Sequence, residues 1–465
     1  MMLDTLLHDD GAPTLDELFR RAAVQRPYAT ALCDPPNRAA ITGTPPRRLT
    51  YVEVDNAVSA VAARLRGLGL QTDAVVAFQL PNVIDSVVML LGVLRAGMIA
   101  APLPMLWRGD DIVAALAASG ATALVTAARI GGTDHAAIAM RAAADHFPIR
   151  HVGVFGASGL DGVSAFDDVF AASAPASPAA PARDDDAAAH VAVITFESTP
   201  DGVRALARDH RRMLAAAAAL PAEAGRRGAV LTTVPLSSFA GLALALVPWL
   251  LAGTQLVLHH PFDADVLAAQ IRDHHCGLVV LPGPVSEPLA AAGIIDPAAH
   301  DVAALWRSVP HGQARQGAPR RHDVLAYGEY ALSPLPPAAA MPEMARSAAG
   351  TLLLRGPMLP HAWPAAAALR GDGFVDTGYP CADGDLAAAQ PPAGLACIGG
   401  YRLPLAAIAR RIAALDPSAT VAALPHALTG SRLAGAGADP AAMAQALARV
   451  HPLLADAFLP RPAAA

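Results

Sequence analysis

The sequence predicts an α/β protein. We expect a large N-terminal domain with two lobes of mixed, largely parallel sheets flanked by helices, followed by a small truncated α+β C-terminal domain. Helical and strand patterns alternate along the chain, and several strands are continuous apolar runs, as in parallel strands buried on both faces. A segment rich in Ala, Pro and Ser interrupts the alternation. These observations predict a large domain over 1–395, with lobes of about 1–175 and 188–395, a linker over 171–187 and a C-terminal domain over 396–465.

The first lobe opens with clear helix and strand signals. A threonine cap and apolar residues at helical spacing predict a helix over Thr14–Gln25. A second helix is expected over Tyr51–Leu68, then a strand over Ala74–Leu80 and a helix from Ile84 to Ala96. This order is typical of helices that connect parallel strands.

Two apolar stretches, Val87–Leu106 and Phe239–Leu258, need separate consideration because hydrophobic residues make up 54% of the chain. A membrane-spanning helix needs about 20 largely uninterrupted apolar residues. Arg95 and two prolines interrupt the first stretch, and Pro248 and two glycines interrupt the second. Each stretch therefore predicts a buried helix followed by a buried strand.

The later part of the chain continues the alternation. A strand over 191–196, a polar loop over Glu197–Arg204 and a helix over Asp209–Ala219 are expected. In the C-terminal domain, Pro404 suits the first turn of a helix. A last helix is expected over Pro440–Val450.

The composition excludes several classes of function. The 465 residues carry 34 basic side chains, all of them arginine, against 40 acidic ones. That balance provides no basic field for nucleic acid or an anionic membrane.

The absence of lysine means that no residue of this sequence can form a Schiff base or act as a phosphate-binding lysine, and arginine presents its charge in a different geometry. The four separated cysteines predict reduced thiols in a cytoplasmic protein, and the acidic N-terminus predicts no export signal.

Two histidine-containing clusters, His259-His260 and His274–Cys276, suggest a metal site at first sight. Zinc needs three or four convergent ligands, and adjacent histidines on extended chain point in opposite directions. The acidic run Asp184–Asp186 is typical of a solvated linker. We therefore expect no metal site.

Eight segments carry a family resemblance. In chain order they read RRLTYVEVDNAVSAVAARLRGLGL, VVAFQLPNVIDSVVMLLGVLRAGMIAAPLPML, SGATALVT, LLAGTQLVL, GLVVLPGP, LLLRGPML, DGFVDTGYP and GGYRLPLAAIARRI. Together they resemble the adenylate-forming superfamily of acyl- and aryl-CoA synthetases, with its AMP-binding domain. The resemblance implies activation of a carboxylate by ATP to an acyl-adenylate, followed by transfer to a thiol as the C-terminal domain rotates. It implies ATP or AMP and Mg²⁺ as cofactors, and CoA or a carrier-protein thioester as a further ligand.

The segment that resembles the family's phosphate loop departs from its pattern. Ser198 and Gly202 match, and so does His210 after a one-residue gap. Ala205 stands where the family has lysine, with Arg204 beside it.

Two acidic residues and a proline also enter this loop. Glu197 and Asp201 place negative charge where the polyphosphate should lie, at a cost of roughly 4 kcal/mol for each like-charge contact at about 4 Å in an effective dielectric of 20. Pro200 removes a backbone donor. The loop is therefore poorly suited to ATP unless a metal ion or Arg204 compensates.

Other positions that match the family's motifs differ as well. The motif that serves adenine, phosphate and Mg²⁺ appears as Tyr327-Gly328-Glu329-Tyr330-Ala331, so its carboxylate is out of place. The ribose aspartate is replaced by Tyr379, with Asp376 three residues earlier. The hinge arginine is absent before Gly399, and the hairpin that carries the adenylation lysine is not found after it.

The resemblance then supplies the candidate site residues. Candidates for catalysis are Ser198, His210, Glu329 and Asp376. Candidates for cofactor binding are Ser198, Gly202, Arg204, Tyr327, Gly328 and Tyr379. Candidates for substrate binding are Ser237, Ser238, Phe239 and Gly312.

Two functions fit these residues. The first is a diverged ligase-like enzyme that binds a carboxylate or acyl-thioester in a specialised small-molecule pathway, without ordinary acyl-adenylation. The alternative is a catalytically inactive homologue that serves as a binding or scaffolding partner of a carrier protein or an active paralogue.

Overall fold

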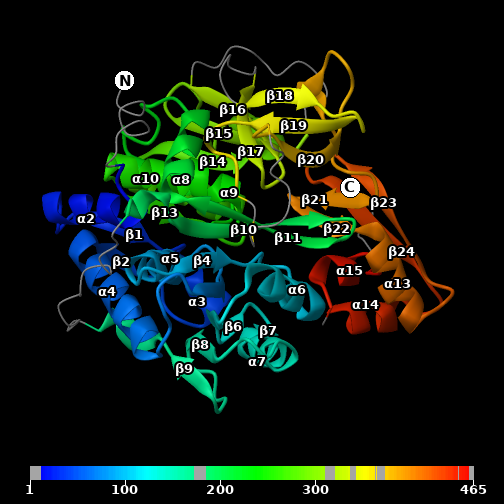
Figure 1. Ribbon diagram of the computed structural model, residues 1–465, viewed down its shortest axis with the longest axis horizontal. Helices are drawn as coiled ribbons and strands as arrows, with labels where there is room; N and C mark the ends of the chain where they lie inside the picture. The colour runs from blue at the N-terminus through cyan, green and yellow to red at the C-terminus, as the bar shows by residue number, and fades with distance from the viewer. Residues whose placement is uncertain are drawn as a thin grey trace.

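The computed structural model describes residues 12–171, 185–308, 320–335, 342–361, 363, 372–448 and 450–459. Its architecture is the predicted α/β arrangement, with two large mixed sheets, a smaller third sheet and a small C-terminal domain (Figure 1). Most of the expected linker over 171–187 lies outside the described residues.

The first sheet has seven described strands, of which only the β10–β11 pair is antiparallel. Its order is β11 (Gly202–Asp209), β10 (Val191–Thr199), β4 (Ile99–Pro102), β3 (Val75–Gln79), β5 (Ala123–Ala127), β8 (His151–Phe155) and β9 (Val163–Ala165). The continuous apolar runs at β3, β4 and β5 are buried along their whole length, as expected for parallel strands covered on both faces.

The second sheet has eight described strands, mostly parallel, with antiparallel pairs at its two edges. Its order is β17 (Ala331–Leu335), β16 (Arg321–Tyr327), β15 (Asp301–Trp306), β14 (Cys276–Pro282), β12 (Ala229–Thr232), β13 (Leu256–Leu258), β1 (Thr30–Cys33) and β2 (Arg48–Thr50). The two sheets therefore do not divide the chain at its linker. Strands β1 and β2 join the second sheet, and β10 and β11 join the first.

Helices between the two sheets form the main core with both of them. They are α2 (Leu15–Gln25), α4 (Tyr51–Gly67), α5 (Ile84–Arg95), α8 (His210–Ala216), α9 (Phe239–Gly241), the π-helix η4 (Leu242–Leu246) and α10 (Val247–Ala252). The short α3 (Arg38–Thr42) packs nearby. Both apolar stretches are a buried helix followed by a strand, as predicted. In the described part of the chain, no helix combines the length and apolarity needed to cross a bilayer.

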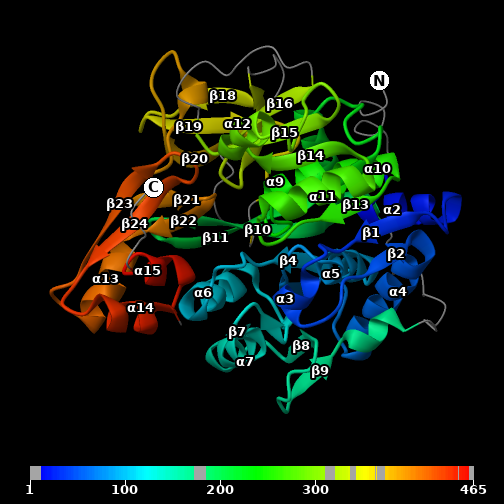
Figure 2. The same cartoon turned by 180° about the vertical axis from the view of Figure 1, so that it is seen from behind.

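Outer helices cover the remaining faces of the sheets (Figure 2). Helices α6 (Gly109–Ser119) and α7 (His135–Asp145) pack on the first sheet, and α11 (Ala264–His274) and α12 (Gly283–Ala291) pack on the second. The third sheet contains β18 (Glu343–Arg346), β19 (Thr351–Arg355) and β20 (Val375–Pro380). A short hairpin joins β6 (Arg129–Ile130) to β7 (Thr133–Asp134).

The C-terminal domain has its own core around a four-stranded sheet in the described residues. Its elements are β21 (Leu395–Ile398), β22 (Tyr401–Pro404), α13 (Leu405–Leu415), β23 (Thr420–His426), β24 (Gly430–Ala436), α14 (Pro440–Ala448) and α15 (Pro452–Asp456). Pro404 ends β22 and precedes α13, one position before the expected first turn. Strand β22 lies against β10, so this domain contacts the first sheet directly (Figure 1).

Candidate functional site

The prediction of a polar loop over Glu197–Arg204 is wrong, because this segment belongs to the β10–β11 hairpin. The strand ladder pairs Glu197 with Arg204 and Ser198 with Val203, and the turn lies at Pro200-Asp201. Side chains alternate between the two faces of a strand. Glu197 is the last of six consecutive buried residues, because both faces of β10 are covered up to this point, and Ser198 is half-buried. The polar residues of this segment predicted a loop, because the residues that compensate the buried charge of Glu197 lie more than 100 positions later in the sequence and could not be recognised.

The Glu197 carboxylate is the centre of a buried polar cluster. Its Oε2 accepts a hydrogen bond from the backbone N–H of Glu329 at 2.8 Å. Its Oε1 accepts one from the Tyr379 hydroxyl at 3.2 Å and forms an ion pair with Arg402. Both members of that ion pair are buried, so each charge depends on the other for compensation.

Arg402 comes from the C-terminal domain, at the second position of β22. Burial lowers the pKa of its guanidinium to about 9, which still leaves it charged at neutral pH. The guanidinium carbon also lies 5.1 Å from the centre of the Tyr379 ring, within the range of a cation–π contact. The sequence reasoning used the GGYRLPL segment to identify the fold and missed this arginine as a site residue.

Gly328 is the point at which these groups converge. Its φ of +60° lies in the left-handed region that favours glycine. A Cβ atom built there would lie 2.5 Å from Glu197 Oε2, 2.6 Å from an Arg402 guanidinium nitrogen and 2.7 Å from the Tyr379 hydroxyl. Protein side chains therefore fill the space beside this glycine.

Glu329, in the turn between β16 and β17, belongs to the same cluster. Its carboxylate accepts a hydrogen bond from the backbone N–H of Phe239 at 2.6 Å and lies 3.6 Å from Arg307. Burial raises the pKa of this carboxyl, and Arg307, the Phe239 N–H and Arg208 oppose that increase. Arg208 stacks on the Phe239 ring at 3.6 Å and donates to the backbone carbonyls of Glu329 and Tyr330.

Two further candidates have structural partners at the edge of this cluster. The Tyr327 hydroxyl donates to the backbone carbonyl of Ala387 at 3.2 Å, and burial raises its pKa. The Arg204 guanidinium donates to the Tyr330 hydroxyl at 2.8 Å. Arg204, on β11, thus contacts Tyr330 in the turn between β16 and β17.

The other candidates divide into residues near the cluster and residues away from it. Ser198, Ser237 and Ser238 line the same small cavity as Glu329. His210 lies elsewhere, where its Nδ1 accepts a hydrogen bond from the backbone N–H of Leu15. Asp376 accepts one from the N–H of Gly378. Gly202 follows the hairpin turn, and Gly312 lies outside the described residues.

A family model described as AMP-binding enzyme matches residues 19–340. The chain belongs to this family. Among curated relatives of this AMP-binding protein, the salicyl-AMP ligase / salicyl-S-ArCP synthetase of Mycobacterium tuberculosis is 36% identical over 146 residues, which are 31% of this chain and 25% of the relative. Phosphinothricin tripeptide synthetase PhsC of Streptomyces viridochromogenes is 35% identical over 94 residues, or 19% of this chain and 9% of the relative. The matched segments thus span a quarter or less of either relative.

Solved structures share the fold of this AMP-binding family member at low sequence identity. The amide bond synthetase McbA of Marinactinospora thermotolerans has a TM-score of 0.72 at 18% identity, covering 94% of each chain. Apo MbtA of Mycobacterium smegmatis has a TM-score of 0.66 at 21% identity, covering 95% of this chain and 89% of the other. These likenesses establish the adenylate-forming fold with its small C-terminal domain.

As formed by the described residues, the cavity at the cluster is too small for the nucleotide that the family uses. It has a volume of about 70 Å³ and is lined by residues of both domains, including Ser238, Arg307, Glu329, Gly400 and Arg402. Sites for drug-sized ligands are roughly 300–1,000 Å³. Side chains obstruct the nucleotide by filling the space beside Gly328, and charge repulsion is not the main cause, because Arg402 compensates the charge of Glu197. We therefore assign no reaction step to ATP in this arrangement.

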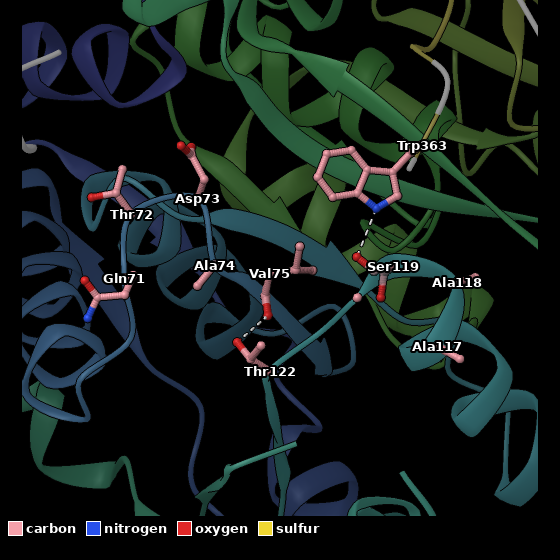
Figure 3. Close-up of a pocket in the computed structure, with 11 residues that line it drawn as sticks. Gln71, Thr72, Asp73, Ala74, Val75, Ala117, Ala118, Ser119, Thr122 and Trp363 are labelled. Atoms are coloured by element: carbon pink, nitrogen blue, oxygen red, sulfur yellow. Dashed lines mark hydrogen bonds between the residues drawn. The ribbon is translucent and has the colours of Figure 1, made fainter. Parts of the chain in front are cut away.

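A cavity of about 400 Å³ lies away from the cluster, at the amino ends of β3 and β5 (Figure 3). The Trp363 indole borders it and donates from Nε1 to the backbone carbonyl of Ser119 at 2.9 Å. Ligands of open α/β sheets bind outside the carboxyl ends of strands, which is the opposite edge. Among the described residues, no group of three or more His, Cys, Asp or Glu side chains is placed to hold a metal ion.

Proposed function

We propose that this AMP-binding family member binds a carboxylate or acyl-thioester in a specialised small-molecule pathway without forming an acyl-adenylate. One observation carries the proposal. Glu197, Tyr379 and Arg402 occupy the space beside Gly328, where the family resemblance places the nucleotide.

The same region supports recognition of an acyl group or carboxylate. Arg307 can still donate hydrogen bonds to a ligand, because its contact with Glu329 is long, at 3.6 Å, and its side chain is 21% exposed. Ser237 lines the same cavity and offers a hydroxyl group, whereas the Ser238 hydroxyl donates to the Pro235 carbonyl and accepts from the Gly241 N–H. Guanidinium groups and hydroxyls are suitable donors to carboxylate oxygens. The salicyl-AMP ligase relative is named for an aromatic carboxylate, which makes aromatic acids reasonable first ligands to test.

Two measurements test this proposal together. An ATP–pyrophosphate exchange assay over a panel of aromatic and aliphatic acids should remain at background. In thermal shift measurements, ATP·Mg²⁺ and AMP should leave Tm unchanged, while a carboxylate or its CoA thioester should raise it, because ligands that bind only the folded state stabilise it. Exchange above background with any acid would show that the cluster opens for ATP and would overturn the proposal.

The small volume of the cavity favours a second candidate. A cavity of about 70 Å³ is too small for most metabolites. The protein would then act as a non-catalytic partner of a carrier protein or an active paralogue. Stabilisation by such a purified protein, together with no response to any acid or thioester, would favour this role over the first.

A further inference from the structure

A second cavity lies between the two domains, on the other side of Arg402 from the cluster. It has a volume of about 250 Å³ and lies among the start of α6, the tip of the β10–β11 hairpin, α13 and α15. Trp107, Ile408 and Leu454 give it apolar walls, and Arg402 and His451 give it polar ones. Arg402 lines both cavities.

Two described residues that line this cavity each carry a buried donor without a partner. Among the described residues, neither the Arg402 Nη2 nor the His451 Nε2 has a hydrogen-bond partner, although Arg402 is 7% and His451 1% exposed. His451 Nδ1 accepts a hydrogen bond from the backbone N–H of Leu453, so Nε2 carries the proton and is a donor. Buried polar groups of native proteins are nearly always satisfied. Two unsatisfied donors on residues that line one cavity therefore point to an acceptor that binds there.

The nearby charges favour an anionic acceptor. Arg108 is buried beside Trp107 and donates to the backbone carbonyls of Met105 and Trp107. No carboxylate in the described ranges forms an ion pair with it, so its charge is uncompensated locally. Three acidic side chains also line the cavity: Asp110 and Asp111 both contact Arg411 at 3.3 Å, and Asp201 is exposed to solvent at the tip of the hairpin.

We propose that this cavity binds a small, largely apolar monocarboxylate, with the carboxylate at Arg402 and His451 and the apolar body against Trp107, Ile408 and Leu454. This cavity adjoins the one at Glu329 and shares Trp107, Ser198 and Arg402 with it, but the inference does not depend on the proposed function. The ligand would share Arg402 with Glu197, so its binding affects the cluster directly.

The test uses butyrate, hexanoate and benzoate as probes on the full chain, with benzamide as the uncharged match of benzoate. Calorimetric titration should show saturable binding of at least one acid and binding of benzamide that is roughly tenfold weaker, the loss expected for hydrogen bonds to a charged group. Ala407→Trp fills the cavity from α13 and should abolish the binding that remains in a Ser237→Trp background, where the Glu329 cavity is blocked. Ala406→Trp, on the exposed side of the same helix, should not.

Further variants locate the binding. His451→Asn should weaken it roughly tenfold, and the ¹⁵N resonance of His451 Nε2 should shift on titration in the unmodified protein. Ser237→Trp, at the adjoining Glu329 cavity, should leave it unchanged. The inference is overturned if none of the acids binds at millimolar concentration, if benzamide binds equally well, or if Ser237→Trp rather than Ala407→Trp removes binding. Loss of binding in both Ala406→Trp and Ala407→Trp would also overturn it.

Discussion

At the scale of single residues, the Glu197–Arg402 pair dominates the candidate site. Removing one partner of a buried ion pair leaves an uncompensated charge and typically costs 3–5 kcal/mol, whereas replacing both partners together is often close to neutral. The pair also connects the large domain to the C-terminal domain through two residues that are 205 positions apart in sequence.

We expect Glu197→Gln to lower the free energy of unfolding by about 3 kcal/mol, because Arg402 loses its counter-charge. Arg402→Gln should have a similar effect. The double variant should recover much of the loss, which urea denaturation would measure as a coupling free energy. If the two losses simply add, the ion pair has no energetic role.

Gly328→Ala should be strongly destabilising, by about 3 kcal/mol, because it combines left-handed strain with contact against three polar atoms. Gly378→Ala is the matched control. Its φ is +71°, but nothing lies within 4 Å of the added Cβ, so only the backbone cost of about 1 kcal/mol should remain. Equal losses in thermal unfolding would mean that the region beside Gly328 is open.

At the scale of elements, α4 and α5 pack closely at Gly92 but not at Gly67, so the two glycines should respond differently to substitution. A Cβ at Gly92 of α5 would overlap Val61 of α4, whereas one at Gly67 of α4 meets nothing within 4 Å. Gly92→Ala should destabilise the protein by about 1–3 kcal/mol through overpacking. Gly67→Ala should stabilise it by up to about 1 kcal/mol, because alanine restricts the unfolded chain. Opposite signs in parallel urea titrations would confirm the register of the two helices.

The helices and strands of the first lobe could be predicted because their signals are local. Thr14 and Thr50 each form a capping box at the start of α2 and α4, and apolar spacing marks the buried faces. The candidate site could be predicted only in part, because its contacts are not local. Glu197 and Arg402 are 205 residues apart, so no local pattern indicates that they form a pair.

At the scale of the whole molecule, buried histidines predict acid sensitivity. Burial is the main cause that lowers the pKa of His135 and of His451 to about 3, and nearby arginines add to it. Both are therefore neutral in the folded state, while the unfolded chain binds protons at about pH 6.5. Their contribution is complete above pH 6.5 and is lost as the pH falls toward 3.

We therefore expect the free energy of unfolding to fall by about 2 kcal/mol for each of these histidines between pH 6.5 and pH 5. Urea titrations at the two pH values measure this difference. A variant with His135→Gln and His451→Gln should show a flatter pH dependence. An unchanged slope in that variant would assign the acid sensitivity to other groups.

The cluster around Gly328 also constrains substitution. Glu197 and Arg402 each compensate the charge of the other, and both fit beside residue 328 only because that residue has no side chain. Any single substitution that removes Glu197 or Arg402 leaves a buried charge without its partner, so the single variants should be less stable than either the unmodified protein or the double variant. The three positions are therefore coupled, so that a substitution at one of them changes which residues the other two tolerate.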